Sequence, residues 1–425
     1  MSEATHTQGL EDPLTQLNQV LGKLSLQVRD LFERKQFQQA ELIIQQVLSI
    51  VPNHPIALMN LATVNLRLQR YVEAYGLFQQ AKSFMGDRID PFVYCGLTES
   101  CHFLNKTDEI RHYGQLALSL RKKQVKSLPV VAIPSTNPAA FNPHQPTENI
   151  ISYSLFGQLP RYCEGAILNV QLAKEIYPEW TCRFYVNETV PNTVIQRLQQ
   201  AGAQIVHVQQ PEILGFFWRF LVLEDPTVKR FLIRDADSLL GYRERAAVDE
   251  WISSNQWFHV MRDFYSHSEL ILAGMWGGCT GVFQQVKAGM IAFIQAHQTD
   301  TQRELDQEYL RQAIWPTIQQ SLLSHDSQHY DVDALDFPAP TKLTAHEQLP
   351  FHIGANDATQ VIQFQINHSS AKEITWILRN EQHQEICRYD VRTDDHHSFE
   401  VIFPQYYAQQ IKAGLWYVES FPKAK

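Results

Sequence analysis

Between positions 150 and 234 the sequence alternates short apolar runs with longer amphipathic segments, and this alternation constrains the fold more than any other feature. The alternation predicts strands and helices in turn, and hence a parallel sheet with helices on both faces. Ligands of such sheets bind outside the carboxyl ends of the strands. The predicted strands are 150–154, 182–186, 204–208 and 230–234, and the predicted helices are 162–177, 191–201 and 216–224.

The last of these strands ends in two carboxylates, Asp235 and Asp237. Side chains two positions apart on a strand point to the same side of the sheet, so both carboxylates face one direction. Two hard oxygen donors suit Mg²⁺ or Mn²⁺, and such a cation keeps open positions that a nucleoside diphosphate fills. Asp-x-Asp alone is a weak signal because it is common in exposed turns. Its position at a strand end favours a functional site.

An internal repeat precedes this region. Phe37 and Ala40, followed by Ile44 and Val47, recur as Tyr71 and Ala74, followed by Phe78 and Ala81. The spacing matches the period of about 34 residues of the tetratricopeptide repeat, whose small residues let two helices approach closely. A looser third copy carries Gly96 and Ala117. Residues 24–126 therefore resemble three tetratricopeptide hairpins, which would recruit a protein partner; an ordinary helical bundle is the alternative.

Other segments of the 425-residue chain predict a multidomain protein with α-helical and α/β parts. We expect residues 1–23 to be disordered and the proline-rich segment 127–149 to be an extended linker. The tail 357–425 alternates apolar and polar residues, which predicts a small β-rich unit without a catalytic pattern. Between the carboxylates and the tail, the pattern predicts helices at 248–253 and 302–314, strands at 259–262 and 321–324, and a glycine-rich strand or turn at 274–278.

Composition excludes several classes of protein. The net charge of −9 and the pI near 6.0 argue against a nucleic-acid surface. Six scattered cysteines without a Cys-x-x-Cys pair indicate reduced thiols and a cytoplasmic location, either free or peripheral at the inner face of the membrane. We expect no signal peptide, because the first residues lack a basic start and an apolar core. The longest apolar stretch, about 270–283, is shorter than the roughly 20 residues that span a bilayer.

Several segments together resemble known enzymes. The runs that begin at Arg161, Tyr177, Phe217 and Phe231 resemble the donor-binding half of GT-A glycosyltransferases. Later runs, which begin at His259, Ile271, Asp306 and Ser324, are similar to a bacterial and viral group of surface-polysaccharide glycosyltransferases. The resemblance covers residues 150–356, and its motifs are specific together but weak one by one.

The resemblance implies roles for particular residues. Asp237 would be the main metal ligand, Asp235 would hold the ribose or share the cation, and His352 would be a third ligand. Arg219 and Arg234 would bind phosphate, because a guanidinium matches two phosphate oxygens. Tyr153 and Ser154 would lie near the nucleobase. Each also has an ordinary explanation: an apolar-flanked histidine is commonly a core residue, and either arginine could form a structural ion pair.

The acceptor side of the reaction is less defined. Asp306 and Asp263 are the candidates for a catalytic base or an acceptor-binding group, although Asp also caps helices and starts turns. Trp276, which lies between glycines, could stack on a sugar ring, or it could pack inside the strand. His267 lies on the loop that leads to this segment and could line the acceptor cleft.

These observations favour a metal-dependent glycosyltransferase. Its donor would be a UDP- or GDP-sugar, and its acceptor a glycan, a glycolipid or a protein. The alternative is a repeat-type interaction module with an inactive transferase-like domain. A nucleotidyl or phosphoryl transferase is a third possibility, but the segment 155–160 after the first strand carries only Gly157 instead of a glycine-rich phosphate loop.

Overall fold

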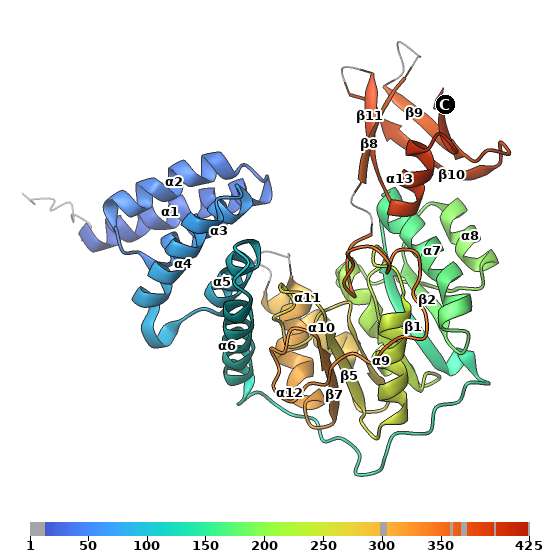
Figure 1. The fold of residues 1–425 in the computed structure, drawn as a ribbon, viewed down its shortest axis with the longest axis horizontal. Coiled ribbons are helices and arrows are strands. Elements are labelled where there is room, and N and C mark those ends of the chain that lie inside the picture. The colour runs from blue at the N-terminus through green and yellow to red at the C-terminus, as the bar shows by residue number, and fades with distance from the viewer. Residues whose placement is uncertain (1–12, 298–303, 358–359, 367–371, 395–396, 424–425) are drawn as a thin grey trace, which may run out of the picture. The chain divides into compact units, whose positions relative to one another are not determined.

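The computed structural model describes residues 13–297, 304–357, 360–366, 372–394 and 397–423. The chain forms two compact units (Figure 1). The first unit consists of residues up to Gln124 together with Gln328–Val332, and the second consists of Val125–Ser327 and the residues from Asp333 onward.

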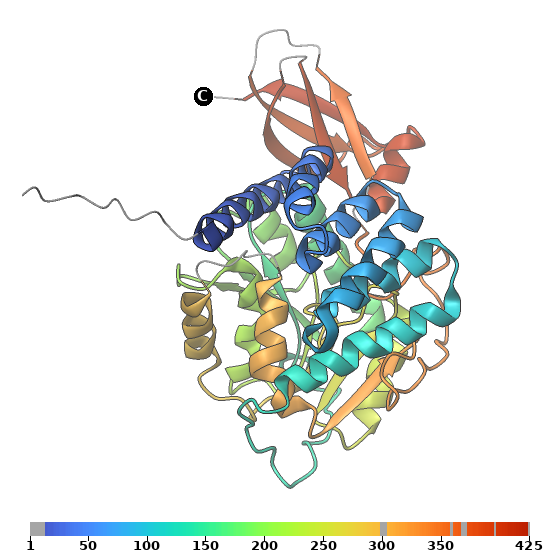
Figure 2. The same ribbon diagram turned by 90° about the vertical axis from the view of Figure 1, so that its left-hand side faces the viewer.

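The first unit is an array of helices, seen from a second side in Figure 2. They are α1 (Pro13–Glu33), α2 (Phe37–Ile50), α3 (Pro55–Arg67), α4 (Tyr71–Met85), α5 (Pro91–Phe103) and α6 (Thr107–Val125). Both α3 and α5 begin with proline and are capped by the preceding side chain, His54 or Asp90, which accepts a backbone N–H.

The first helix begins earlier than predicted. Residues 13–23, which we expected to be disordered, belong to α1, and residues 1–12 lie outside the described residues. The reason is the spacing of Leu21, Leu24 and Val28, which place one apolar face of α1 against Ala40 and Ile44 of α2.

Small residues hold the helices close together, as the repeat pattern predicted. Ala62 and Ala74 are fully buried. A Cβ atom on Gly96 of α5 would lie 2.1 Å from Cζ of Phe78, so only glycine leaves room for this ring of α4. The fold of the first unit is therefore a tetratricopeptide-like stack of helical hairpins.

The proline-rich segment 127–149 is extended, but it is bound to the second unit rather than free. The Val131 N–H donates to Thr317 Oγ1 (3.0 Å), and Gln320 Nε2 donates to the Val131 carbonyl (2.8 Å). Further along, Arg230 Nη1 donates to the Ala139 carbonyl (2.8 Å). The segment is therefore a strap on the second unit, and we keep this name for it.

The second unit is built on a seven-stranded sheet with the order β3-β2-β1-β4-β6-β5-β7. β6 is antiparallel to both neighbours, β4 and β5, and the other pairs are parallel, so the sheet is mixed rather than purely parallel. The strands are β1 (Asn149–Leu155), β2 (Thr181–Val186), β3 (Gln204–His207), β4 (Arg230–Ile233), β5 (Phe258–Arg262), β6 (Trp276–Cys279) and β7 (Leu322–Asp326).

Glycines make β6 possible. A Cβ atom on Gly277 would lie 2.6 Å from the Phe231 carbonyl, and one on Gly278 would lie 2.3 Å from the Phe258 ring. β6 therefore packs closely between its two neighbours because it lacks side chains at these positions.

Helices accompany the sheet. They are α7 (Pro160–Ile176), α8 (Asn192–Gln200), the 3₁₀ helix η3 (Gly215–Glu224), α9 (Tyr242–Ser253), α10 (Val286–Ala296), α11 (Leu305–Tyr309) and α12 (Trp315–Ile318). The helix predicted at 302–314 is α11 followed by a π-helical turn, Leu310–Ile314, and its residues 302–303 lie outside the described residues.

The alternating tail forms two small sheets, with the orders β10-β9-β12 and β11-β8. It shares one hydrophobic core with β1, β2, α7 and α8, so it belongs to the second unit. We call it the C-terminal module. Its elements are β8 (Gln360–Gln365), β9 (Glu373–Arg379), β10 (Glu385–Arg392), β11 (Ser398–Phe403), α13 (Gln405–Lys412) and β12 (Tyr417–Pro422).

Candidate active site

A cavity of about 320 Å³ lies at the carboxyl ends of β1 and β4, and we call it the switch-point pocket. From β1 the sheet extends through β2 and β3 in one direction and from β4 onward in the other. Strands that diverge in this way leave a crevice between their carboxyl ends, where α/β sheets bind ligands. The lining residues are Ser154, Leu155, Phe156, Tyr162, Phe216, Arg219, Asp235, Ala236, Asp237, Glu304 and Asp306.

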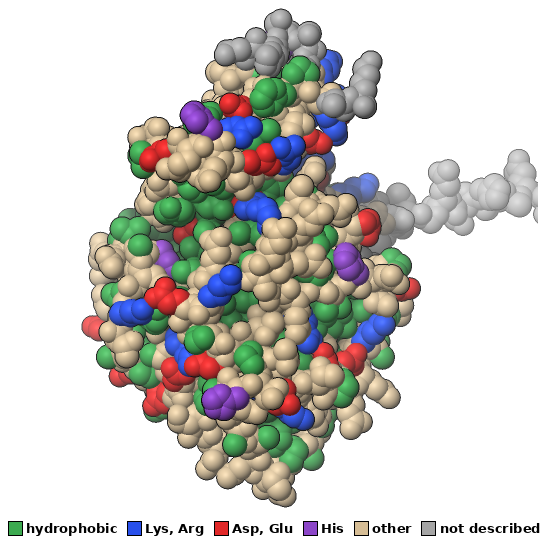
Figure 3. Space-filling model, turned by 90° about the vertical axis from the view of Figure 1, so that its right-hand side faces the viewer, with side chains coloured by type: hydrophobic (Ala, Val, Ile, Leu, Met, Phe, Trp, Pro, Cys, Tyr) green, Lys and Arg blue, Asp and Glu red, His purple; other side chains and the backbone are tan. Residues whose placement is uncertain are grey.

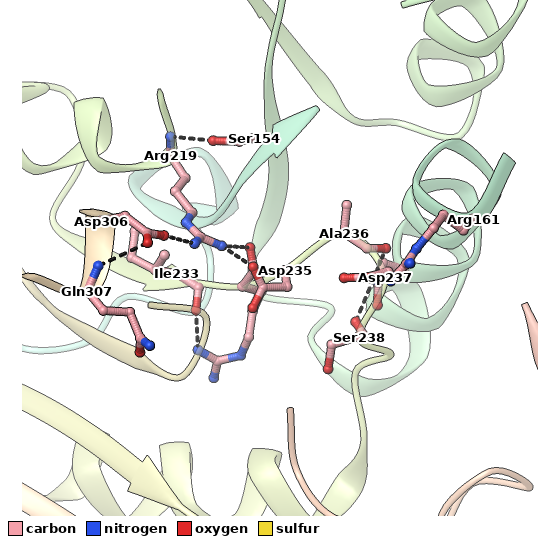
Figure 4. A network of polar contacts seen from close by, with 12 residues as sticks. Ser154, Arg161, Arg219, Ile233, Asp235, Ala236, Asp237, Ser238, Asp306 and Gln307 are labelled. Carbon is pink, nitrogen blue, oxygen red and sulfur yellow. Dashed lines mark hydrogen bonds and ion pairs between the residues drawn. The ribbon is translucent and has the colours of Figure 1, made fainter. Parts of the chain in front are cut away.

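Arg219 organises one wall of the pocket (Figure 4). Its buried guanidinium forms ion pairs with Asp235 and with Asp306, where Nη2 lies 2.9 Å from Oδ2. Its backbone N–H donates to Ser154 Oγ (2.9 Å), which ties η3 to the end of β1. One arginine thus joins the two carboxylates, which lie far apart in the sequence.

Asp237 lies on the loop that follows β4, on the side away from Arg219 (Figure 4). Arg161 Nη2, from the first turn of α7, donates to Asp237 Oδ2 at 2.6 Å. Burial raises the pKa of Asp237 above its ordinary value, the charge of Asp235 raises it further, and Arg161 lowers it only in part. A cation bound beside Asp235 and Asp237 would reduce the repulsion between their negative charges.

Helix α7 fixes the loop that carries the carboxylates. The side chain of Asn169, which is fully buried, donates to the carbonyls of Ala236 (3.3 Å) and Ser238 (2.9 Å) and accepts the Leu240 N–H (3.0 Å). A Cβ atom on Gly165 would lie 2.5 Å from the Ala236 carbonyl, so this position requires glycine. The carboxylates are therefore held by packing as well as by charge.

Asp306 completes the pocket from α11. Its Oδ1 accepts the Gln307 N–H (2.9 Å) and its Oδ2 faces Arg219. Burial raises the pKa of Asp306 above its ordinary value, although Arg219 lowers it in part and Asp235 raises it again. A carboxylate with a raised pKa is a stronger proton acceptor than an ordinary aspartate.

Five of the predicted site residues come together in this pocket: Ser154, Arg219, Asp235, Asp237 and Asp306. Three others lie in the core. Tyr153 has none of its surface exposed and stacks on Phe184, because neighbouring residues of β1 point to opposite faces of the sheet. Tyr153 does not line the pocket, which contradicts the nucleobase role predicted for it.

The structure also contradicts the roles predicted for Arg234 and Trp276. Arg234 is buried and pairs with Glu244 (3.3 Å), so it is structural and does not line the pocket. Trp276 has none of its surface exposed, because its neighbours Phe231 and Phe220 enclose it. A sugar ring cannot reach it there.

Asp263, His267 and His352 form a separate cluster after β5. Asp263 Oδ1 accepts from Arg243 Nη2 (2.9 Å), and its Oδ2 accepts the Ile353 N–H (2.8 Å). His267 Nδ1 accepts the Asp263 N–H (3.0 Å), and the His352 ring packs edge-on to the His267 ring. None of the three lines the switch-point pocket. We call this group the Asp263 cluster.

A metal site formed by protein side chains alone is absent from the described part of the chain, where no group of three or more His, Cys, Asp and Glu residues is arranged to hold an ion. His352, the predicted third ligand, does not line the switch-point pocket with Asp235 and Asp237. It stacks on Phe264, with ring centroids 3.9 Å apart.

Some pocket residues were not predicted. Arg161 reaches the pocket only through its ion pair with Asp237. Tyr162, Phe156 and Phe216 contribute aromatic surface to the lining, and Glu304 also lines the pocket. For Arg161 and Tyr162, the signal was available in the sequence, because they follow β1 directly at the start of a helix. Phe216 and Glu304 carry no local signal and reach the pocket only through the fold.

Comparison with known proteins adds little to the geometry. No family model matches the chain, and no curated protein matches it. Among solved structures, the tetratricopeptide domain of Sgt2 from Aspergillus fumigatus is 15% identical over 28% of this chain and 91% of that chain, with a TM-score of 0.22. A variant of the O-GlcNAc transferase of Thermobaculum terrenum is 14% identical over 51% of this chain and 46% of that chain, with a TM-score of 0.28.

The described helices include none that is both long and apolar enough to cross a membrane.

Proposed function

We propose that the second unit is a glycosyltransferase domain of the GT-A type, and that its switch-point pocket binds a nucleoside-diphosphate sugar. The supporting observation is the position of Asp235 and Asp237, which lie together at the carboxyl end of β4 and face a cavity at the switch point of the sheet. The same pocket contains a buried guanidinium and exposed aromatic surface, which suit the phosphate and base parts of a nucleotide.

The two carboxylates fit a divalent cation that binds together with the nucleotide. Mg²⁺ and similar ions are commonly held by one or two carboxylates plus substrate phosphates, rather than by a complete protein cage. Asp235 and Asp237, which both line the pocket, are such a pair. When bound, the cation would act as a Lewis acid that neutralises the departing diphosphate.

The side chains of the pocket divide the remaining tasks. Arg219 places positive charge beside the carboxylates and can pair with a phosphate oxygen that approaches them. Phe156, Tyr162 and Phe216 form the aromatic part of the lining, against which a nucleobase can stack. Ser154 holds the Arg219 backbone and so fixes the guanidinium relative to β1.

Asp306 is the candidate base of the transfer. The acceptor oxygen bonds to the anomeric carbon, and the bond from that carbon to the diphosphate oxygen breaks. The hydroxyl proton passes to the Asp306 carboxylate, and the nucleoside diphosphate leaves with the electron pair. The raised pKa of Asp306 makes it a better proton acceptor than an ordinary aspartate. The tetratricopeptide-like helices of the first unit would recruit the acceptor or another protein partner.

The test is a thermal-shift screen of UDP- and GDP-sugars with and without Mn²⁺, followed by a hydrolysis assay for every donor that stabilises the protein. A ligand that binds only the folded state raises its apparent stability. We expect at least one donor to raise the melting temperature more with Mn²⁺ than without it and to be hydrolysed slowly. A protein that no donor stabilises and that hydrolyses none would contradict the proposal.

A further inference from the structure

A second cavity, of about 510 Å³, lies next to the switch-point pocket. It is lined by residues 158–161, at and just before the start of α7, and by residues of strands β8, β9, β10 and β11. Arg161 connects the two cavities, because it lines this one and donates to Asp237, which lines the other. We call the second cavity the C-terminal groove.

The groove is a fixed part of the second unit. Glu164, one turn after Arg161 on α7, is fully buried and pairs with Arg197 of α8 through both carboxylate oxygens (2.8 and 2.7 Å). The same carboxylate accepts hydrogen bonds from Tyr389 of β10 (2.5 Å) and Tyr407 of α13 (3.0 Å). This network locks the C-terminal module to the helix that carries Arg161, so both walls of the groove are preformed.

The exposed lining combines aliphatic side chains with charges of both signs. Val361 and Leu159 expose more than half of their surface, at 54% and 57%. Arg392 and Glu400 are both exposed and both line the groove. Within the described residues, their side chains form no ion pair or hydrogen bond. Figure 3 shows acidic and basic side chains interspersed over the C-terminal module on the face that it displays.

We propose that the C-terminal groove binds an extended polypeptide segment of the acceptor beside the switch-point pocket. This inference rests on the proposed function, since it makes the acceptor a protein. The exposed arginine, the exposed glutamate and the exposed aliphatic side chains of the groove call for a ligand with acidic, basic and aliphatic groups. Among the three acceptor classes, only a polypeptide carries all three kinds of group together. Fixed walls reduce the entropy lost on binding such a segment.

The other acceptor classes fit less well. A glycan site would present an exposed aromatic face, but the aromatic lining residues Trp376 and Tyr389 are only 1% and 5% exposed. A lipid headgroup with a phosphate would favour a cluster of cations, whereas Lys423 of the groove is already paired with Asp390 (3.1 Å).

The test is affinity selection of a synthetic library of short random peptides on the full-length protein. The wild type should enrich peptides with an aliphatic residue flanked by an acidic and a basic residue. Arg392→Glu should exchange the selected acidic residue for a basic one, and Glu400→Lys should make the reverse exchange. Arg388→Glu is the matched control, because Arg388 lies on the same strand, is paired with Glu385 and does not line the groove. It should leave the selected motif unchanged.

Selection that is absent in the wild type, or that both charge reversals leave unchanged, would overturn the proposal. The proposal would also be overturned if the wild type bound neutral oligosaccharides or anionic phospholipid vesicles instead of peptides, and if Arg392→Glu abolished that binding. Hydrolysis of the sugar nucleotide by the wild type without peptide is the separate readout. Hydrolysis without peptide selection removes the groove assignment alone. Peptide selection without hydrolysis removes the proposed function, and with it the role of the peptide as acceptor, but leaves the groove as a peptide-binding site.

Discussion

The Asp263 cluster and the switch-point pocket both place aspartates at the same edge of the sheet, but the surroundings of these aspartates differ. In the Asp263 cluster, both oxygens of the Asp263 carboxylate accept hydrogen bonds, from Arg243 and from the Ile353 N–H. Asp263 does not line the switch-point pocket. In the switch-point pocket, Asp235 has 46% of its side chain exposed, and it shares Arg219 with Asp306.

This difference distinguishes a carboxylate that holds parts of the fold together from one that is suited to bind a ligand or a proton. Asp263 joins the loop after β5 to the Ile353 segment, and each of its carboxylate oxygens accepts a hydrogen bond within the protein. The pocket carboxylates face a cavity, and burial and mutual repulsion raise the pKa of Asp237 and of Asp306. Groups whose charge the protein only partly compensates are suited to bind a cation or a proton.

Removing the arginine from each group would give the largest contrast. Arg219→Met leaves two carboxylates without their buried cation, and we expect it to lower the free energy of unfolding by about 3–5 kcal/mol and to abolish donor hydrolysis. Arg243→Met is the matched variant, and it should cost less because Arg243 is 28% exposed and Asp263 keeps the Ile353 N–H. Urea denaturation measures both. Equal costs would contradict the distinction between the two groups.

Neutralising one carboxylate in each group tests their chemistry. Asp237→Asn should lower the rate of donor hydrolysis by about 10²–10³-fold, because a preorganised charge interaction with the diphosphate and its cation is lost. Asp263→Asn should leave that rate within a few-fold of the wild type, since Asp263 lies outside the pocket. If Asp263→Asn were the more damaging variant in the hydrolysis assay, the pocket would be wrongly placed.

The support of the carboxylate loop can be tested with two buried asparagines. Asn169→Ala removes hydrogen bonds to the loop, and we expect a loss of about 1–3 kcal/mol in stability together with a lower hydrolysis rate. Asn149→Ala, at the amino end of β1, also loses buried hydrogen bonds, to the carbonyls of Asn142 and Glu179. It should show a similar loss of stability without the loss of rate. The two measurements are denaturation and hydrolysis, and a rate loss in both variants would indicate a general effect of destabilisation.

The smallest effect concerns pH. Because the pKa of Asp237 is raised in the folded state, the folded carboxyl binds its proton more tightly than the unfolded one. Its contribution to stability is therefore present at low pH and is lost as pH rises from the ordinary value of 3.8 through the raised pKa. The melting temperature of the wild type should fall relative to Asp237→Asn across this window. A rise would mean that Arg161 outweighs burial.

The sequence predicted the sheet well where the local pattern decides the structure. The alternation of strands and helices up to β4 is correct because apolar runs and amphipathic segments require little tertiary context. The antiparallel direction of β6 was not predictable from this pattern, because it depends on the loop that joins β5 to β6. The first residues of α1 were missed because the polar composition of the N-terminus outweighed the spacing of Leu21, Leu24 and Val28.

The pocket was predicted in part for a similar reason. Asp235 and Asp237 follow from the strand end alone, but the two neighbours Tyr153 and Ser154 could not be separated, because β1 is buried on both faces and shows no alternation. Trp276 between glycines suggested an open surface, whereas Phe231 and Phe220 fill that space. Arg161 and Arg234 are chemically alike, and only the fold decides that the first meets Asp237 and the second meets Glu244.

The most direct test of the central claim is calorimetric titration of Mn²⁺ into the protein with and without UDP and GDP. A two-carboxylate site predicts binding of Mn²⁺ only when a nucleoside diphosphate is present, and loss of that binding in Asp237→Asn. Strong binding of Mn²⁺ without a nucleotide, or nucleotide-dependent binding that survives in Asp237→Asn, would contradict the account.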